Sequence, residues 1–284
     1  MKLNSANQMD ADRITEILPP SGLGRVDLRE IWRYRELLGT LVWRDLKVRY
    51  RQTFLGVIWV VGQPLLMVSI FTLIFQKVAG LSLESGVPYP LFVFAGLVPW
   101  QFFANGVQNA GVSILGNTQL VSKVYFPRLI IPAAPIVGGL IDLGIVSTTI
   151  VLIQLWYGWP PSVFAVVCVP LALFILLALT FGIGCWMAAL NVNYRDVRVI
   201  MPFLLQFGMF ATPVLYPVSR LPGSLQQIAA LNPMTGVLEL FRGGLLGEPV
   251  ETWHVLLSLV CAGFLLVTGV MAFTRMERQF ADVM

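Results

Sequence analysis

Residues 163–190 read VFAVVCVPLALFILLALTFGIGCWMAAL, a run of 28 residues without a single Asp, Glu, Lys, Arg or His. A helix rises about 1.5 Å per residue, so roughly 20 apolar residues cross the hydrocarbon core of a bilayer. The run lacks the alternation of apolar and polar residues that a strand of a membrane barrel shows. The sequence therefore predicts a transmembrane helix here, because a helix bonds all of its own backbone groups.

Five further stretches have the same character, and they lie at residues 54–76, 91–112, 129–156, 199–218 and 253–274. The composition agrees, since 57 % of the chain is hydrophobic and 12 % is charged, whereas about a quarter of the residues of a soluble domain are charged. A soluble protein is excluded. We predict an all-α integral membrane protein with a six-helix transmembrane domain over residues 54–274.

The basic residues near the ends of these stretches orient the chain, because Lys and Arg concentrate on the cytoplasmic side of a membrane. With six spans both termini lie on one side, and eleven of these charges fall on that side against three on the other. We expect a multi-pass protein of the bacterial inner membrane with a cytoplasmic tail over residues 1–30 and a cytoplasmic C-terminus over residues 275–284. We expect no cleavable signal peptide in the tail.

Two further segments match neither a span nor an ordinary loop. Residues 31–53 place apolar side chains at helical spacing among basic ones, which predicts an amphipathic interface helix or, alternatively, a plain membrane anchor. Residues 219–247 are apolar but are cut by Asn232-Pro233 into pieces too short to cross. We predict a re-entrant helical hairpin on the outer side, lining the mouth of a pore.

Residues for nucleotide and metal chemistry are missing from the sequence. Each of the four lysines is followed by Leu or Val, whereas a P-loop needs Lys before Ser or Thr. The one histidine, His254, is expected to be a solvated anchor at the outer end of the last span. The acidic residues form no cluster that would hold a divalent ion and a sugar diphosphate. We expect no enzyme, no metal site and no cofactor in this chain.

Asp142 is the one acid inside the third predicted span. Ionisable residues inside a membrane are costly and by default mark proton or ion sites. The alternative is a structural carboxyl that bonds to a neighbouring helix. The spans supply no second acid or base to relay a proton, so the sequence favours the structural role.

Aromatic stripes run along two of the predicted spans. Phe203, Phe207 and Phe210 are spaced i, i+4 and i+7 in the fifth span, and Phe71 lies in the first. Such stripes commonly pack against lipid or other helices. Sugars, however, present flat faces that stack on aromatic rings, so a path for a glycan is the second interpretation.

An ordered set of motifs resembles the permease subunit of ATP-binding-cassette polysaccharide exporters, which carry O antigen, capsule or teichoic acid chains. The resemblance runs from about residue 36 to the C-terminus. The motifs are Tyr50-Arg51-Gln52-Thr53-Phe54-Leu55-Gly56 before Trp59 and Gln63-Pro64, Gly96-Leu97-Val98-Pro99-Trp100, Phe126-Pro127-Arg128, Asn193-Tyr194-Arg195-Asp196-Val197 and Asn232-Pro233-Met234.

The resemblance implies a homodimer of six-span permeases that works with two copies of a separate nucleotide-binding ATPase subunit, which would hold ATP and Mg²⁺. The implied cargo is a lipid-linked polysaccharide, foremost O antigen, with membrane lipids as further partners and no nucleic acid. Residues 113–128 correspond to the loop that couples the permease to the ATPase. Its candidate contact residues are Asn117, Gln119, Leu120, Lys123 and Tyr125.

The resemblance also suggests three further groups of site residues. A substrate channel is expected along Trp59, Gln63, Phe71, Phe203, Gln206, Phe207, Phe210 and Tyr216. A cytosolic entrance for the lipid head group, or a site for anionic lipid, is expected at Arg44, Lys47, Arg49 and Arg51. An outer gate is expected at Leu225, Ile228, Leu231, Leu238 and Phe241.

Two rival functions remain at this point. An exporter of the same fold for lipids or drugs would not need an aromatic path wide enough for a polymer. A membrane-embedded glycosyltransferase should show pairs of acidic residues at the cytosolic interface, and the sequence does not show them.

Overall fold

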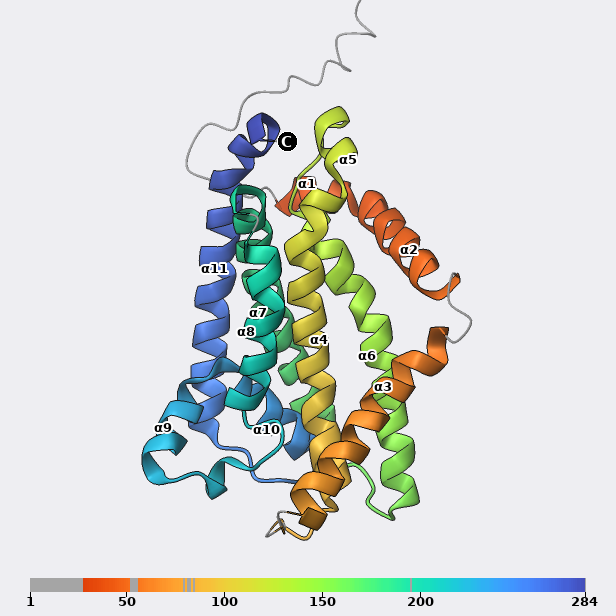
Figure 1. Cartoon of the computed structure of the whole chain (residues 1–284), viewed down its shortest axis with the longest axis vertical. Helices are drawn as coiled ribbons and strands as arrows, with labels where there is room; N and C mark the ends of the chain where they lie inside the picture. The colour runs from red at the N-terminus through yellow and green to blue at the C-terminus, as the bar shows by residue number, and fades with distance from the viewer. Residues whose placement is uncertain are drawn as a thin grey trace, which may run out of the picture.

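The computed structural model describes residues 28–51, 56–78, 80, 83, 85–194 and 196–283. Long helices stand side by side in a bundle (Figure 1). Within the described residues, five helical segments are long and apolar enough to cross a membrane. They are α3 (Gly56–Phe71) with its π-helical continuation η2 (Thr72–Val78), α4 (Tyr89–Gly116), α6 (Ile130–Trp156), α7 (Ala165–Asn193) and α11 (Thr252–Val283).

The predicted span over residues 199–218 is a shorter helix, α8 (Val197–Ala211), and the count of six full spans is therefore not confirmed. Its 15 residues extend only about 22 Å at 1.5 Å per residue. The helix ends because Thr212 precedes Pro213, and a residue before proline is disfavoured in helical conformation. Thr212 is extended, with φ −95° and ψ 142°.

The cytosolic segments expected from the sequence gather at one end of the bundle. The end of α11, α1 (Leu28–Arg33) and α5 (Thr118–Lys123) lie together there, and α9 (Gly223–Leu231) lies at the opposite end (Figure 1). Most of the predicted tail, residues 1–27, lies outside the described residues, and residues 28–30 already belong to α1. The predicted C-terminal segment continues α11 as helix to Val283.

The predicted interface helix forms two helices, α1 and α2 (Arg35–Arg51), which meet at Tyr34. Residues 52 and 53 of the prediction lie outside the described residues. Leu41 of α2 is buried with Ile130 and Ala134 of α6. This part of the chain is therefore helical, as expected, and is packed onto the bundle. Its depth in the membrane interface remains a prediction.

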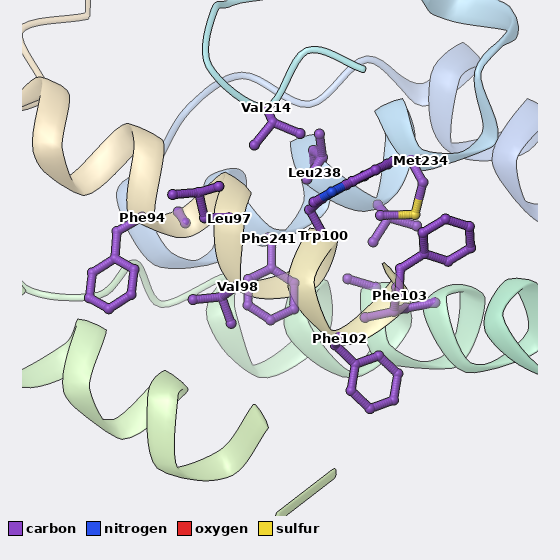
Figure 2. Close-up of a cluster of buried hydrophobic side chains, with 14 of the residues drawn as sticks. Phe94, Leu97, Val98, Trp100, Phe102, Phe103, Val214, Met234, Leu238 and Phe241 are labelled. Carbon is purple, nitrogen blue, oxygen red and sulfur yellow. The ribbon is translucent and has the colours of Figure 1, made fainter. Parts of the chain in front are cut away.

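Helix α4 forms the centre of the protein. In its most apolar stretch 78 % of the residues are buried, against 11 % for the first span. Figure 2 shows aromatic side chains of α4, among them Trp100 and Phe103, beside Leu238 and Phe241 of α10 (Pro233–Leu246). The first span is consequently peripheral, and much of its surface faces outward.

Helices α7 and α11 approach closely through glycine. A Cβ atom placed on Gly269 would lie 2.1 Å from the carbonyl oxygen of Gly182, and one placed on Gly182 would lie 2.6 Å from the backbone of Leu265. Small residues allow such contact between membrane helices, whose association relies on close packing rather than on the hydrophobic effect.

The predicted outer hairpin, residues 219–247, contains the 3-10 turn η3 (Val218–Arg220), α9 and α10. The break falls at Asn232-Pro233, as expected. Asn232 begins α10 by accepting a hydrogen bond from the backbone N–H of Met234 at 3.0 Å, and its Nδ2 donates to Thr212 Oγ1 at 2.8 Å. The re-entrant position of the pair in the membrane remains a prediction.

Arg242 of α10 holds the segment that follows α8. Its Nη1 donates to the carbonyl oxygen of Pro213 at 2.8 Å, and its Nη2 donates to that of Val214 at 2.6 Å. The guanidinium carbon lies 3.6 Å from the centre of the Phe92 ring of α4. Burial lowers the pKa of Arg242 to about 9, so the side chain remains protonated at neutral pH. Arg242 is one of the three basic residues that the sequence analysis assigns to the outer side of the membrane, and the structure buries it.

Replacing Arg242 by methionine should destabilise the protein. Each buried carbonyl left without a donor costs about 1–3 kcal/mol, so Arg242→Met should lower the melting temperature of the purified protein in detergent by about 5 °C or more. Arg275→Met, at an exposed position of α11, is the matched control and should leave the melting temperature unchanged. Equal melting temperatures for the two variants would show that the hydrogen bonds from Arg242 to Pro213 and Val214 do not stabilise the protein.

Candidate functional site

A cavity of about 760 Å³ lies among α2, α3, α4 and α6. Two of the predicted channel residues, Trp59 and Gln63, line it from α3. The other polar side chains of its wall are Gln101, Asn105 and Asn109 of α4, Arg49 of α2 and Asp142 of α6. We call it the α3–α4–α6 cavity.

Asp142 lies at the wall of this cavity and bonds to α2. Its carboxylate accepts hydrogen bonds from Nη1 of Arg49 and from the hydroxyl of Tyr50, and Arg49 and Asp142 form an ion pair. The carboxylate therefore bonds to a neighbouring helix, as the structural alternative for Asp142 requires. The pair ties the end of α2 to the middle of α6.

The aromatic stripe of α8 lies on the surface of the protomer. Phe203, Phe207 and Phe210 are exposed, Phe207 at 71 %, and Gln206 beside them is exposed too. A neighbouring face of α8 packs on α4, where a Cβ atom on Gly208 would lie 3.0 Å from the Trp100 ring. The stripe is thus free in a single protomer.

Of the two remaining predicted channel residues, Tyr216 contacts the end of this stripe, whereas Phe71 lies on α3. The Tyr216 hydroxyl donates to the carbonyl oxygen of Phe210 at 2.9 Å. Phe71 is half-buried in α3, and its ring centre lies 6.2 Å from that of Phe75. One protomer therefore brings Trp59 and Gln63 into the cavity but does not join them to the α8 stripe.

The predicted coupling residues lie in and beside α5, between α4 and α6. Gln119, Lys123 and Tyr125 are exposed. Leu120 packs inward against two buried clusters, and Asn117 Nδ2 donates to the carbonyl oxygen of Ser113 at 2.8 Å. Three of the five side chains are therefore free to contact another protein, and two hold the loop in place.

Of the four basic residues predicted at the entrance, two are held in ion pairs within the described part of the chain and two are not. Arg44 pairs with Asp45 at 2.8 Å, and Arg49 pairs with Asp142. Lys47 and Arg51 are exposed and take part in no ion pair of the described residues. The charges of Lys47 and Arg51 are therefore available to a ligand.

Some of the predicted gate residues are exposed and others are buried. Leu225, Ile228 and Leu231 form an exposed row along α9. Leu238 and Phe241 of α10 are fully buried beside α4 (Figure 2). In this conformation the α10 pair packs the interior, and only the α9 row is available to line a passage.

His254 is not the solvated anchor that the sequence predicted. Its Nδ1 lies 2.7 Å from Oε1 of Glu239, and 14 % of its side chain is exposed. Burial raises the pKa of the Glu239 carboxyl, and the hydrogen bond from His254 offsets part of that rise. The pair joins α11 to α10. The sequence carried no signal for this contact between two consecutive helices.

The profile that defines the ABC-2 type transporter family matches residues 36–246. The chain belongs to the ABC-2 type transporter family. The match extends from α2 to the end of α10 and so includes the cavity, the α8 stripe and both outer helices.

Curated relatives extend this similarity over nearly the whole ABC-2 permease. An O-antigen export system permease protein, RfbA, of Myxococcus xanthus is 31 % identical over 90 % of this chain and 98 % of its own length. RfbA of Klebsiella pneumoniae is 28 % identical over 88 % of this chain and 95 % of its own. The capsule polysaccharide export inner-membrane protein CtrC of Neisseria meningitidis serogroup A is 24 % identical, with shares of 86 % and 92 %.

The polar row of α4 in the ABC-2 permease is a feature that the sequence interpretation missed. Gln101, Asn105 and Asn109 are spaced i, i+4 and i+8, so they share one helix face. They lie within residues 91–112, the stretch whose lack of charge predicts a span. Amide groups at helical spacing inside an apolar span were the available signal.

The ion pair between Arg49 and Asp142 should couple energetically. In a double-mutant cycle of Arg49→Gln and Asp142→Asn, we expect a coupling of about 1–2 kcal/mol in the free energy of unfolding in micelles, because either single change already removes the ion pair between the two side chains. A cycle of Arg44→Gln with Asp142→Asn is the control and should be additive, since Arg44 pairs with Asp45. Additivity in both cycles would contradict the pairing.

Proposed function

We propose that this permease exports a lipid-linked polysaccharide, foremost O antigen, from the cytosol across the bacterial inner membrane. The observation that carries the proposal is the 31 % identity to an O-antigen export permease over 98 % of that protein's length. Two further relatives with the same name are 28 % identical. The aromatic and amide groups on α3, α4 and α8 suit a cargo of sugar rings and hydroxyls.

The working unit in this proposal is a homodimer. The α8 stripe is exposed although it carries Gln206 among its aromatic rings, and an amide facing lipid is costly. A second copy related by a two-fold axis would place two such stripes across from one another and enclose a path. Such a path would take its rings from α8 and from the first span.

Energy would come from a separate ATPase subunit present in two copies, with ATP and Mg²⁺ bound there. The described part of the permease contains no group of His, Cys, Asp or Glu that could hold a metal ion. The exposed residues Gln119, Lys123 and Tyr125 offer the partner a docking surface at the end of the bundle that we assign to the cytosol. In this orientation both termini are cytoplasmic.

Movement of the partner would reach the spans through packed contacts. Leu120 of α5 packs against the cluster that joins α2 to α6, and the Arg49–Asp142 pair continues this connection along α6. A shift of α5 would therefore displace α2 and α6 together, as expected of an interface with two stable arrangements. Lys47 and Arg51 at the end of α2 would meet the pyrophosphate of the lipid carrier or anionic lipid.

Deleting the gene and locating the glycan tests the proposed function. The polymer should accumulate on the cytosolic face of the inner membrane and vanish from the cell surface, and the wild-type gene should restore it. The purified permease alone should neither hydrolyse ATP nor transport. Loss of the polymer altogether would favour a glycosyltransferase, and normal surface glycan would favour an exporter of lipids or drugs.

Substitution in the exposed part of the coupling loop tests the ATPase contact. Tyr125→Asp should reduce the amount of ATPase subunit that copurifies with the permease at least about tenfold, because losing a central aromatic contact commonly costs 2 kcal/mol or more. Tyr157→Asp is the matched control, since Tyr157 is also exposed but follows α6 at the opposite end of the bundle. Equal copurification of the two variants would contradict the docking surface.

A further inference from the structure

The α3–α4–α6 cavity has a row of amides on one wall. Gln101, Asn105 and Asn109 follow one face of α4 over about 12 Å, at 1.5 Å per residue. Gln63 adds a fourth amide from α3, one helical turn after Trp59. The amide row on α4 and the Trp59 ring on α3 therefore border the same cavity from different helices.

These amides are available to a ligand. Among the hydrogen bonds of the described residues, none involves the side chain of Gln63, Gln101, Asn105 or Asn109. Each side-chain amide offers two donors and one acceptor oxygen. Lipid tails cannot satisfy such groups, and leaving them unpaired in an apolar medium costs free energy. The cavity is thus suited to an occupant rich in hydroxyl groups.

The charges of the cavity select against an anionic ligand. Among the described residues that line it, Arg49 is the only cation, and Arg49 is paired with Asp142. Asp142 also accepts a hydrogen bond from Tyr50. A pyrophosphate would have to compete with this carboxylate for Arg49, whereas a neutral hydroxyl would bond to the amides without disturbing the pair.

We propose that the α3–α4–α6 cavity is a binding station for neutral sugar residues of the exported glycan. The amides of Gln101, Asn105 and Asn109 bond to the hydroxyl groups, and the Trp59 ring stacks on the flat face of a sugar. This assignment rests on the proposed function and adds a contact surface on α4 to it. The volume of about 760 Å³ falls in the range of roughly 300–1,000 Å³ typical of ligand sites.

A station of this kind has to bind weakly. A chain that passes through a membrane protein must enter each site readily and also leave it. Neutral amide bonds provide such affinity, since a hydrogen bond made in exchange for water contributes only about 0.5–1.5 kcal/mol. The amide row would guide successive sugars along α4 without retaining any one of them.

Photo-crosslinking in living cells tests this placement directly. A benzophenone amino acid is introduced at Asn105, or at Phe174 as the control, which is exposed on α7 and does not line the cavity. In cells that make the polymer and contain the ATPase subunit, the probe at Asn105 should yield a permease adduct that stains for glycan, and the probe at Phe174 should not. An adduct containing only phospholipid at Asn105, or no adduct, would overturn the proposal.

A substitution series measures the effect on transport. The double variant with Asn105→Leu and Asn109→Leu should slow the appearance of glycan at the cell surface at least about tenfold at matched permease levels. Gln108→Leu should export at the wild-type rate, because Gln108 is an exposed amide of the same helix that does not line the cavity.

The outcomes of these experiments distinguish a failure of the binding station from a failure of the proposed function. Equal export rates for the wild type, the double variant and Gln108→Leu would overturn the station and leave the proposed function standing. Equal slowing by Gln108→Leu would also overturn the cavity assignment. Failure of the wild-type gene to restore surface glycan in the deletion strain would overturn both.

Discussion

Much of the architecture depends on the bonds from Arg242 to the backbone beyond α8. A chain in a membrane has no water with which to satisfy its carbonyl groups, and Pro213 prevents α8 from continuing as a helix. The guanidinium supplies the missing donors to Pro213 and Val214 and rests on the ring of Phe92. A short α8 is thereby joined to α10 and to α4, and its aromatic face stays at the surface.

Helix α4 serves two different environments because its faces differ in chemistry. Trp100 and Phe103 pack with α10 in the interior (Figure 2), while the amides of Asn105 and Asn109 border the α3–α4–α6 cavity. The apolar face fixes the helix in the bundle by burial. The rigid packing behind the amide row keeps it in position, as a site that must recognise passing groups requires.

The helices at the α1 and α5 end pack against α6. Leu41 and Leu120 pack into one cluster with the start of α6, and the Asp142 carboxylate holds Arg49 and Tyr50 of α2 farther along the same helix. In the proposed mechanism, packed contacts and an ion pair of this kind would carry a displacement of α5 to α6. Force applied to α5 would accordingly reach the wall of the cavity.

The sequence by itself determined that the chain is a helical membrane protein, because continuous apolar runs leave a helix as the only way to bond the backbone in lipid. It also determined the break at Asn232-Pro233 and, through ordered motifs, the family. Only the tertiary structure decided the buried Arg242, the partner of His254 and the contacts of Asp142. These features join residues of different segments, and the energy of a polar contact in a membrane depends on which atom of another segment supplies the second partner. The division of the predicted site residues into free and buried side chains was decided in the same way, because packing between helices, rather than residue type, determines which face of each helix remains open.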